Sequence, residues 1–216
     1  GFLGHTFGFV FNDIIDYNID KSSKEISDRP LISGTISLKN AWIFAFTAMV
    51  IAFLISLYLA LTTGHLYSLL ILAISASFIV LYDLVSKKFL LTDFFVALGV
   101  FFLVVYGASV VSDSLVSLTT LTWIVCTLGA IQVLFMQMIT GGMKDIENDF
   151  YRGAHTLAIR MGVRITEGKL HVSPSFKALA YGIQLIDVIM VFLPFFIVWD
   201  IHSLSSFQYV QWACLI

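Results

Sequence analysis

Residues 41–62 read AWIFAFTAMVIAFLISLYLALT, an apolar stretch without a charged side chain. A helix needs roughly 20 residues to cross a hydrocarbon core of about 30 Å, and this stretch is long enough. Strands cross lipid only in closed barrels, whose sequences alternate apolar and polar residues, and residues 48–61 do not alternate. The stretch therefore predicts a transmembrane helix.

Four further stretches have the same character, and they cover residues 66–84, 90–111, 120–140 and 178–199. Hydrophobic residues make up 59% of the chain and charged residues only 12%, a balance typical of a protein whose main solvent is lipid. We therefore predict an all-α, polytopic transmembrane bundle forming a single domain over residues 1–216. Apolar runs at 1–11 and 207–216 look like cut helices, so we expect the domain to be incomplete at both ends.

The basic residues predict the orientation. If the spans alternate in direction, segments 12–40, 85–89 and 141–177 lie on one side, and every Lys and Arg falls there. The positive-inside rule makes that side cytoplasmic, which predicts a multi-pass protein of the cell membrane in contact with its lipids. The formal net charge of −2 gives no case for nucleic-acid binding.

The first cytoplasmic segment begins NDIIDYNID over residues 12–20. On a helix of about 100° per residue, Asp13, Asp16 and Asp20 fall within an arc of about 60°. Carboxylates crowded in this way are unfavourable unless a cation compensates for their charge. Mg2+ takes one or two carboxylates together with water and phosphate oxygens, so it is a natural partner.

A second acidic segment, KDIEND, covers residues 144–149. Asp145 and Asp149 are one helical turn apart and are placed to share an ion, whereas Glu147 points elsewhere. Either cluster alone is more typical of a solvated loop. Two clusters on the same side, each at the end of a membrane helix, favour a joint metal site instead.

These segments resemble the signatures of the UbiA superfamily of intramembrane prenyltransferases. Residues 12–20 read as N-D-x-x-D-x-x-x-D, and residues 145–156 resemble the second signature, D-x-x-x-D-x-x-x-G-x-x-T. DRPLISG at 28–34 is similar to the family's R-P-I-x-S-G segment. Tyr82 followed by Lys87 resembles the residues that end its fourth helix. One departure is Asp83, where the family often has Ser.

The resemblance implies a nine-helix fold, with the five full stretches as helices three to seven and with the N-terminal helix and C-terminal helices truncated. It also implies transfer of an isoprenyl group from a polyprenyl diphosphate, such as geranylgeranyl diphosphate, to a lipophilic acceptor. By match to the signatures, the residues that would bind the diphosphate through Mg2+ are Asn12, Asp13, Asp16, Asp20, Asp145 and Asp149.

Further residues are predicted to act on the substrate. Arg29, Lys87 and Lys88 would donate charge-assisted hydrogen bonds to phosphate oxygens, and the Tyr82 hydroxyl would lie near the leaving group. Asp93, about one turn inside its helix, is expected to touch substrate. The catalytic set predicted in this way is Asp13, Asp16, Tyr82, Asp145 and Asp149.

Other functions remain open at this stage. The segments at 29–34 and 144–147 look slightly more like those of the archaeal lipid enzymes, the digeranylgeranylglyceryl phosphate synthases, which favours geranylgeranylglyceryl phosphate as acceptor. An aromatic acceptor of quinone biosynthesis is the alternative. A cation-coupled transporter is a further one, but carriers place their charges near the membrane midplane rather than at helix ends.

Overall fold

A computed structural model describes residues 1–21, 27–85, 89, 91–151, 153, 155–166 and 168–197. In chain order the elements are α1 (Phe2–Ile15), α2 (Tyr17–Asp20), α3 (Leu38–Thr63), α4 (Tyr67–Val85), α5 (Asp93–Ser109), the 3-10 helix η1 (Leu115–Ser117), α6 (Thr120–Phe135), the π-helix η2 (Met136–Gly141), α7 (Gly142–Lys144), α8 (Ile146–Tyr151), α9 (Leu157–Arg160), β1 (Arg164–Thr166), β2 (Lys169–His171) and α10 (Pro174–Ile197).

Apolar helices occupy all five predicted stretches. Four of them are long enough to cross a membrane: α3, α4, α10 and the stretch Thr120–Lys144, while α5 is apolar but shorter. Their outward surfaces carry many exposed large hydrophobic side chains, such as Phe44, Leu70 and Leu185, which are suited to lipid rather than to water. The prediction of an all-α, polytopic membrane bundle is confirmed.

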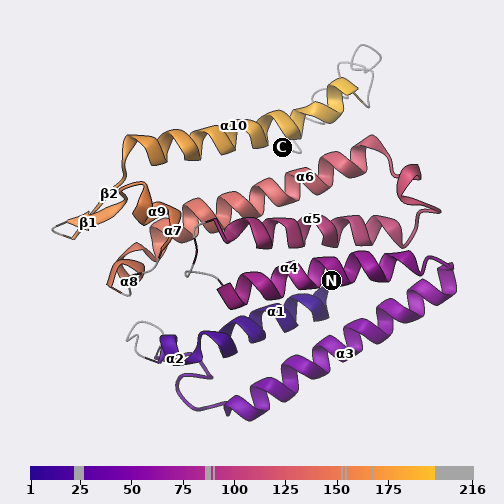
Figure 1. The fold of residues 1–216 in the computed structure, drawn as a ribbon, viewed down its shortest axis with the longest axis horizontal. Helices are drawn as coiled ribbons and strands as arrows, with labels where there is room; N and C mark the ends of the chain where they lie inside the picture. The colour runs from indigo at the N-terminus through magenta and orange to yellow at the C-terminus, as the bar shows by residue number, and fades with distance from the viewer. Residues whose placement is uncertain are drawn as a thin grey trace, which may run out of the picture.

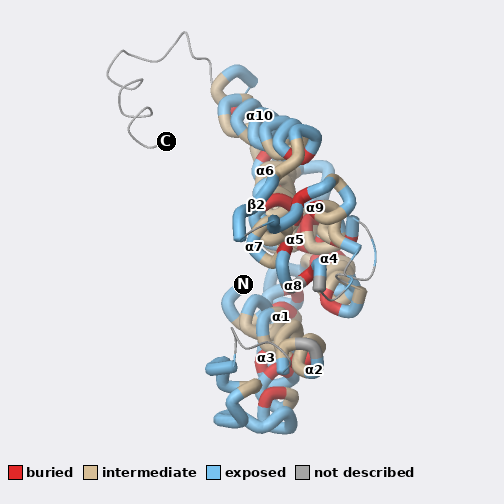
Figure 2. The backbone as a smooth tube through the Cα atoms, turned by 90° about the vertical axis from the view of Figure 1, so that its left-hand side faces the viewer, coloured by how far each residue is buried: buried red, intermediate tan, exposed pale blue. Residues whose placement is uncertain are grey.

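The long helices lie side by side in the order α3, α1, α4, α5, α6 and α10 (Figure 1). The short elements α2, α7, α8 and α9 and the β1–β2 hairpin gather at one end of this layer (Figure 1). Figure 2, turned by a quarter, shows the same stacking order. Both acidic segments are therefore carried at the same end of the helices.

Small residues allow α4 and α5 to approach each other closely. Ser75 is 1% exposed and donates a hydrogen bond from Oγ to the carbonyl oxygen of Gly99 at 2.7 Å. A Cβ atom at Gly99 would lie 2.6 Å from Cγ1 of Ile79, so only glycine fits this crossing. This packing holds α4 against α5, the two helices whose ends carry Tyr82 and Asp93.

A separate hydrophobic cluster holds the segment after α6 in place. Its buried members are Met138, Ile139, Ile146, Ala158, Val163 and Phe176. They come from the π-helix, α8, α9, the loop before β1 and the start of α10, so the cluster ties the second acidic segment to two long helices. Next to it, the antiparallel β1–β2 hairpin is exposed along both strands.

Candidate active site

Both acidic segments contain the same backbone feature. α1 ends at Ile15 and α2 begins at Tyr17, with Asp16 between them at φ −81° and ψ −4°. α7 ends at Lys144 and α8 begins at Ile146, with Asp145 between them at φ −93° and ψ 5°. This bridge region of conformational space is sparsely used and is where many active-site residues lie. The single straight helix expected over residues 12–20 is therefore wrong at Asp16, where the helix is interrupted.

The interruption is slight, because helical hydrogen bonds continue on either side. The amide of Asp16 donates to the carbonyl of Asn12 at 2.9 Å, and the amide of Asp20 donates to that of Asp16 at 2.8 Å. The amide of Asp149 likewise donates to the carbonyl of Asp145 at 2.8 Å. Each acidic segment is thus a kinked helix whose kink is an aspartate.

Arg29 joins the outer carboxylates of the first segment. Its Nη1 atom lies 3.1 Å from Oδ1 of Asp13 and 3.2 Å from Oδ2 of Asp20. Partial burial and the nearby Asp20 carboxylate raise the pKa of Asp13, which lies beyond the apolar run 1–11, while the Arg29 guanidinium opposes that rise. A single cationic nitrogen therefore compensates two of the three carboxylates.

The inner side of the same segment contacts α4. Nδ2 of Asn12 donates a hydrogen bond to Oδ1 of Asp83 at 3.2 Å. Asp83 is only 6% exposed, and its Oδ2 atom is buried without a hydrogen-bond partner among the described residues. The carboxylate of Asp16 is close enough to that of Asp83 to interact with it electrostatically. The position at which the sequence departs from the UbiA pattern thus contacts the first signature directly.

Asp149 is the most buried carboxylate of the second segment, at 2% exposure, whereas the neighbouring Glu147 is exposed.

A Cβ atom added to Gly142 would lie 3.1 Å from the Cβ of Ala158, which shows how closely α7 approaches α9. Thr156, just before α9, has a buried hydroxyl oxygen with no hydrogen-bond partner among the described residues. Water or a polar ligand in the neighbouring cavity, which Thr156 lines, would satisfy this hydroxyl.

Tyr82, in the last turn of α4, lies between the two acidic segments. Its hydroxyl donates a hydrogen bond to Oε1 of Gln137, in the π-helix, at 3.4 Å. The carboxylates that are close enough to interact electrostatically with this phenol belong to Asp16, Asp83, Asp93 and Asp145. Carboxylates of both acidic segments, Asp16 of the first and Asp145 of the second, thus lie within electrostatic reach of one phenol.

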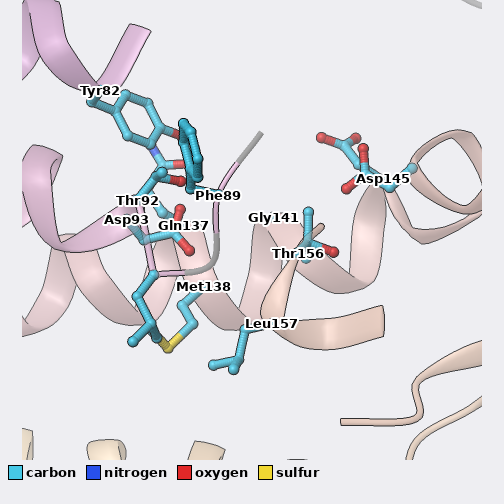
Figure 3. A pocket seen from close by; sticks show the side chains of 13 residues that line it. Tyr82, Phe89, Thr92, Asp93, Gln137, Met138, Gly141, Asp145, Thr156 and Leu157 are labelled. Atoms are coloured by element: carbon cyan, nitrogen blue, oxygen red, sulfur yellow. The ribbon is translucent and has the colours of Figure 1, made fainter. Parts of the chain in front are cut away.

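A polar cavity of about 70 Å³ opens beside Tyr82. Its lining includes the polar residues Tyr82, Thr92, Asp93, Gln137, Asp145, Asp149 and Thr156. Figure 3 shows Tyr82, Asp93 and Gln137 together on one side of this cavity and Asp145 on the other. The first turn of α5, the π-helix and α8 therefore face a common space.

A larger apolar cavity of about 380 Å³ adjoins the polar one. The two cavities share Leu91, Met138 and Leu157 in their walls. The remaining lining residues are Phe94, Leu134, Met161, Leu179 and Ile183, from α5, α6, the end of α9 and α10. A ligand with a polar head and a hydrocarbon tail would match this pair of cavities.

Comparison with protein families gives a match over residues 1–214 to the UbiA prenyltransferase family. The chain belongs to this family. The resemblance inferred from the two acidic signatures is thereby confirmed.

Relatives of the chain are found among archaeal proteins. The chain is 30% identical over 202 residues to the digeranylgeranylglyceryl phosphate synthase of Saccharolobus solfataricus, covering 87% of this chain and 67% of the relative. It is 26% identical to the enzyme of that name from Sulfurisphaera tokodaii, covering 74% of this chain and 54% of the relative. The chain thus spans about half to two thirds of the length of these relatives.

A solved structure supports the fold. The apo structure of a UbiA homolog from Aeropyrum pernix K1 superimposes with a TM-score of 0.71 at 19% identity, covering 98% of this chain and 72% of the homolog. At this identity the likeness establishes a UbiA-type helical arrangement. Together with the four long apolar helices, it makes the chain a multi-pass membrane protein.

The structure brings together some of the predicted site residues of this UbiA protein. Tyr82, Asp93, Asp145 and Asp149 line the polar cavity, and Asp16 lies within electrostatic reach of Tyr82. Asp13, Asp20 and Arg29 form their own cluster and are not among the cavity-lining residues. Asn12 contacts Asp83. Lys87 and Lys88 lie outside the described residues.

Three of the polar residues in the cavity were not predicted from the sequence as site residues: Thr92, Gln137 and Thr156. Thr156 ends the second signature, which was a usable signal. Gln137 accepts the hydrogen bond of Tyr82, from the neighbouring α4. Its place in the cavity depends on the π-helix, which the sequence did not predict.

Proposed function

We propose that this protein is a Mg2+-dependent membrane prenyltransferase that moves an isoprenyl group from a polyprenyl diphosphate to a lipophilic acceptor. The supporting observation is that Tyr82 lines a polar cavity together with Asp145 and Asp149 of the second signature, while Asp16 of the first signature lies within electrostatic reach of the same phenol. Geranylgeranyl diphosphate is the proposed donor, and geranylgeranylglyceryl phosphate is the proposed acceptor.

The donor set suits Mg2+. Carboxylate and amide oxygens are hard ligands, and the buried Thr156 hydroxyl supplies a polar atom that needs a partner. Within the described part of the chain, no three Asp, Glu, His or Cys side chains gather closely enough to hold an ion alone. Phosphate oxygens and water would complete the coordination, as is usual for this ion. Bound Mg2+ would neutralise the charge of the departing diphosphate.

The residues of the chain then have distinct tasks. Asp16, Asp145 and Asp149 would hold the ions, with Asn12 beside Asp16, and Tyr82 would donate a hydrogen bond at the leaving group. The allylic carbon–oxygen bond breaks with its electron pair leaving on the diphosphate, and the acceptor oxygen forms a bond to the same carbon. Asp93, which lines the cavity, is placed to accept the proton that the acceptor hydroxyl loses.

The apolar cavity suits the hydrocarbon part of the donor. It shares a wall with the polar cavity, so a diphosphate bound near Asp145 would place its tail against Leu134 and Ile183. Burial of such a tail contributes about 0.8 kcal/mol for each CH2 group. This free energy would hold the reactive carbon next to the polar cavity.

We also propose that the site faces the cytoplasm. All the described Lys and Arg residues lie in α7, α9, the hairpin, the starts of α3 and α10, or the loops near α2, at the end that carries the acidic segments (Figure 1). The positive-inside rule assigns such an end to the cytoplasm.

A product assay tests this function. The full-length protein, purified in detergent, is incubated with labelled geranylgeranyl diphosphate, Mg2+ and a panel of lipophilic acceptors, including geranylgeranylglyceryl phosphate and aromatic quinone precursors. We expect a prenylated lipid that disappears when EDTA removes the metal. Release of label without any prenylated acceptor in the whole panel would contradict the proposal.

Matched variants of the second segment sharpen the test. Asp145→Asn and Asp149→Asn should each lower turnover by at least about a hundredfold, because each removes a charge proposed to bind metal. Glu147→Gln removes a charge from the same helix, but Glu147 is exposed and is not among the residues that line the cavity, so turnover should stay near that of the wild type. Equal loss in all three variants would mean that overall charge, not the site, is responsible.

A further inference from the structure

Asp83 is a buried charge that the proposed chemistry does not use. It lies next to Tyr82 in the last turn of α4, it is 6% exposed, and only its Oδ1 atom has a hydrogen-bond partner among the described residues, namely Nδ2 of Asn12. Burying a carboxylate with one oxygen unsatisfied costs free energy. Packing stability therefore does not explain the presence of an acid here.

The contact has a direct consequence for the Asn12 side chain. An amide has a donating and an accepting end, and rotation by a half turn exchanges them. An ionised carboxylate can only accept hydrogen bonds, so Asp83 binds the NH2 end of the amide and turns the oxygen away from itself. A hydroxyl at this position would accept or donate and would leave both amide orientations available.

The orientation of this amide matters because of what lies next to it. Asn12 is one helical turn before Asp16, as the backbone hydrogen bond from the N–H of Asp16 to the main-chain carbonyl of Asn12 at 2.9 Å shows, so the two side chains lie on the same face of the helix. The Asp16 carboxylate is itself close enough to Asp83 to interact with it. A cation held by Asp16 would therefore meet either the oxygen or the NH2 group of Asn12, and only the oxygen can bind it.

We propose that Asp83 is a positioning residue that locks the Asn12 amide with its oxygen available to the divalent cation that carries the diphosphate. This inference rests on the proposed function, since it requires a cation at the first signature. Partners of metal ligands act in this way elsewhere: they set the orientation of a ligand, and their loss typically lowers metal affinity by about 10- to 100-fold.

Metal binding without catalysis provides the test. The thermal unfolding midpoint of the full-length protein is measured in detergent with saturating inorganic pyrophosphate and increasing Mg2+, which gives the Mg2+ concentration for half-maximal stabilisation. In Asp83→Leu we expect this concentration to rise by about tenfold or more. Asp113→Asn, which removes an exposed acid from the loop after the C-terminal end of α5, is the control and should leave it unchanged.

A reciprocal exchange keeps the proposal testable even if Asp83→Leu fails to fold. Asn12→Asp alone places two carboxylates against each other and should weaken Mg2+ binding. In Asn12→Asp combined with Asp83→Asn, the amide introduced at position 83 donates to the carboxylate introduced at position 12, whose second oxygen then faces the cation. We expect the double variant to recover to within a few-fold of the wild type, a non-additive result typical of residues in contact.

The outcomes separate the two proposals. If wild-type protein gains no stability from Mg2+ with pyrophosphate, the proposed function fails. If the wild type responds but Asp83→Leu responds at the same Mg2+ concentration, the role of Asp83 is overturned. A double variant no better than Asn12→Asp alone would also overturn it.

Discussion

The hydroxyl of Tyr82 donates a hydrogen bond to Oε1 of Gln137 at 3.4 Å, which links the last turn of α4 to the π-helix that follows α6. The two residues are 55 positions apart, and each lines the polar cavity. Carboxylates of both acidic segments, Asp16 and Asp145, lie within electrostatic reach of this phenol. π-Helical turns often occur at functional sites, and this one places Gln137 in the cavity.

Removal of the Tyr82 hydroxyl should lower turnover without unfolding the protein. A hydrogen bond to a charged group is worth about 1.5–3 kcal/mol, so Tyr82→Phe should reduce kcat by about 10- to 100-fold. Tyr58→Phe is the control, because Tyr58 is 66% exposed on α3 and lies outside the cavity. Steady-state kinetics check the prediction, and an unchanged kcat in Tyr82→Phe would show that its hydroxyl does not take part in the reaction.

Arg29 should affect donor affinity more than stability. Its guanidinium bridges Asp13 and Asp20, but it is 47% exposed, and such surface ion pairs typically contribute at most about 1 kcal/mol. Arg29→Ala should therefore shift the melting temperature little, yet raise the KM for the diphosphate donor by about tenfold, because it removes the positive charge that compensates Asp13 and Asp20 beside the proposed diphosphate site.

Arg164→Ala, in the exposed hairpin, is the matched control for removing one positive charge. A large fall in melting temperature with an unchanged KM for Arg29→Ala would instead assign Arg29 a purely structural role.

The sequence predicted the long helices well because their signal is strong and local. Twenty or so consecutive apolar residues can be satisfied in lipid only by a helix, so α3, α4 and α10 follow from hydropathy alone. The two acidic segments were also predictable, since their spacing repeats over a single helical turn. Their location at one end of the bundle followed from alternation of the spans.

Rotation of each helix about its own axis was not predictable. α3 is apolar all round, so its sequence does not indicate which face meets α1. The contact between Asn12 and Asp83 depends on such rotations in α1 and α4, and it joins residues 71 positions apart. The π-helix at Met136–Gly141 was also missed, because inserting one residue into a turn leaves the apolar composition unchanged.

Two glycines in α5 should respond to the same substitution with opposite signs. Gly99→Ala places a methyl group 2.6 Å from Ile79 at the α4–α5 crossing, so we expect a loss of about 1–3 kcal/mol from overpacking. No atom of the described residues lies within 4 Å of a Cβ at Gly107, so Gly107→Ala should gain about 0.5–1 kcal/mol from helix propensity. Thermal unfolding in one detergent compares the two, and equal shifts would contradict the close crossing.

The apolar cavity predicts how donor length can be changed. Ile183 of α10 lines this cavity and not the polar one, so Ile183→Trp should fill part of the apolar cavity and exclude the end of a long tail. Each CH2 group denied burial costs about 0.8 kcal/mol, so losing two of them lowers the preference for geranylgeranyl over farnesyl diphosphate by about tenfold. Leu185→Trp adds the same ring to α10 at a side chain that is 62% exposed, and it should leave the preference unchanged. Competition between the two donors, scored by product mass, measures the ratio. Because both variants carry the same bulk on the same helix, an equal change in preference would show that the cavity beside Ile183 does not hold the prenyl tail.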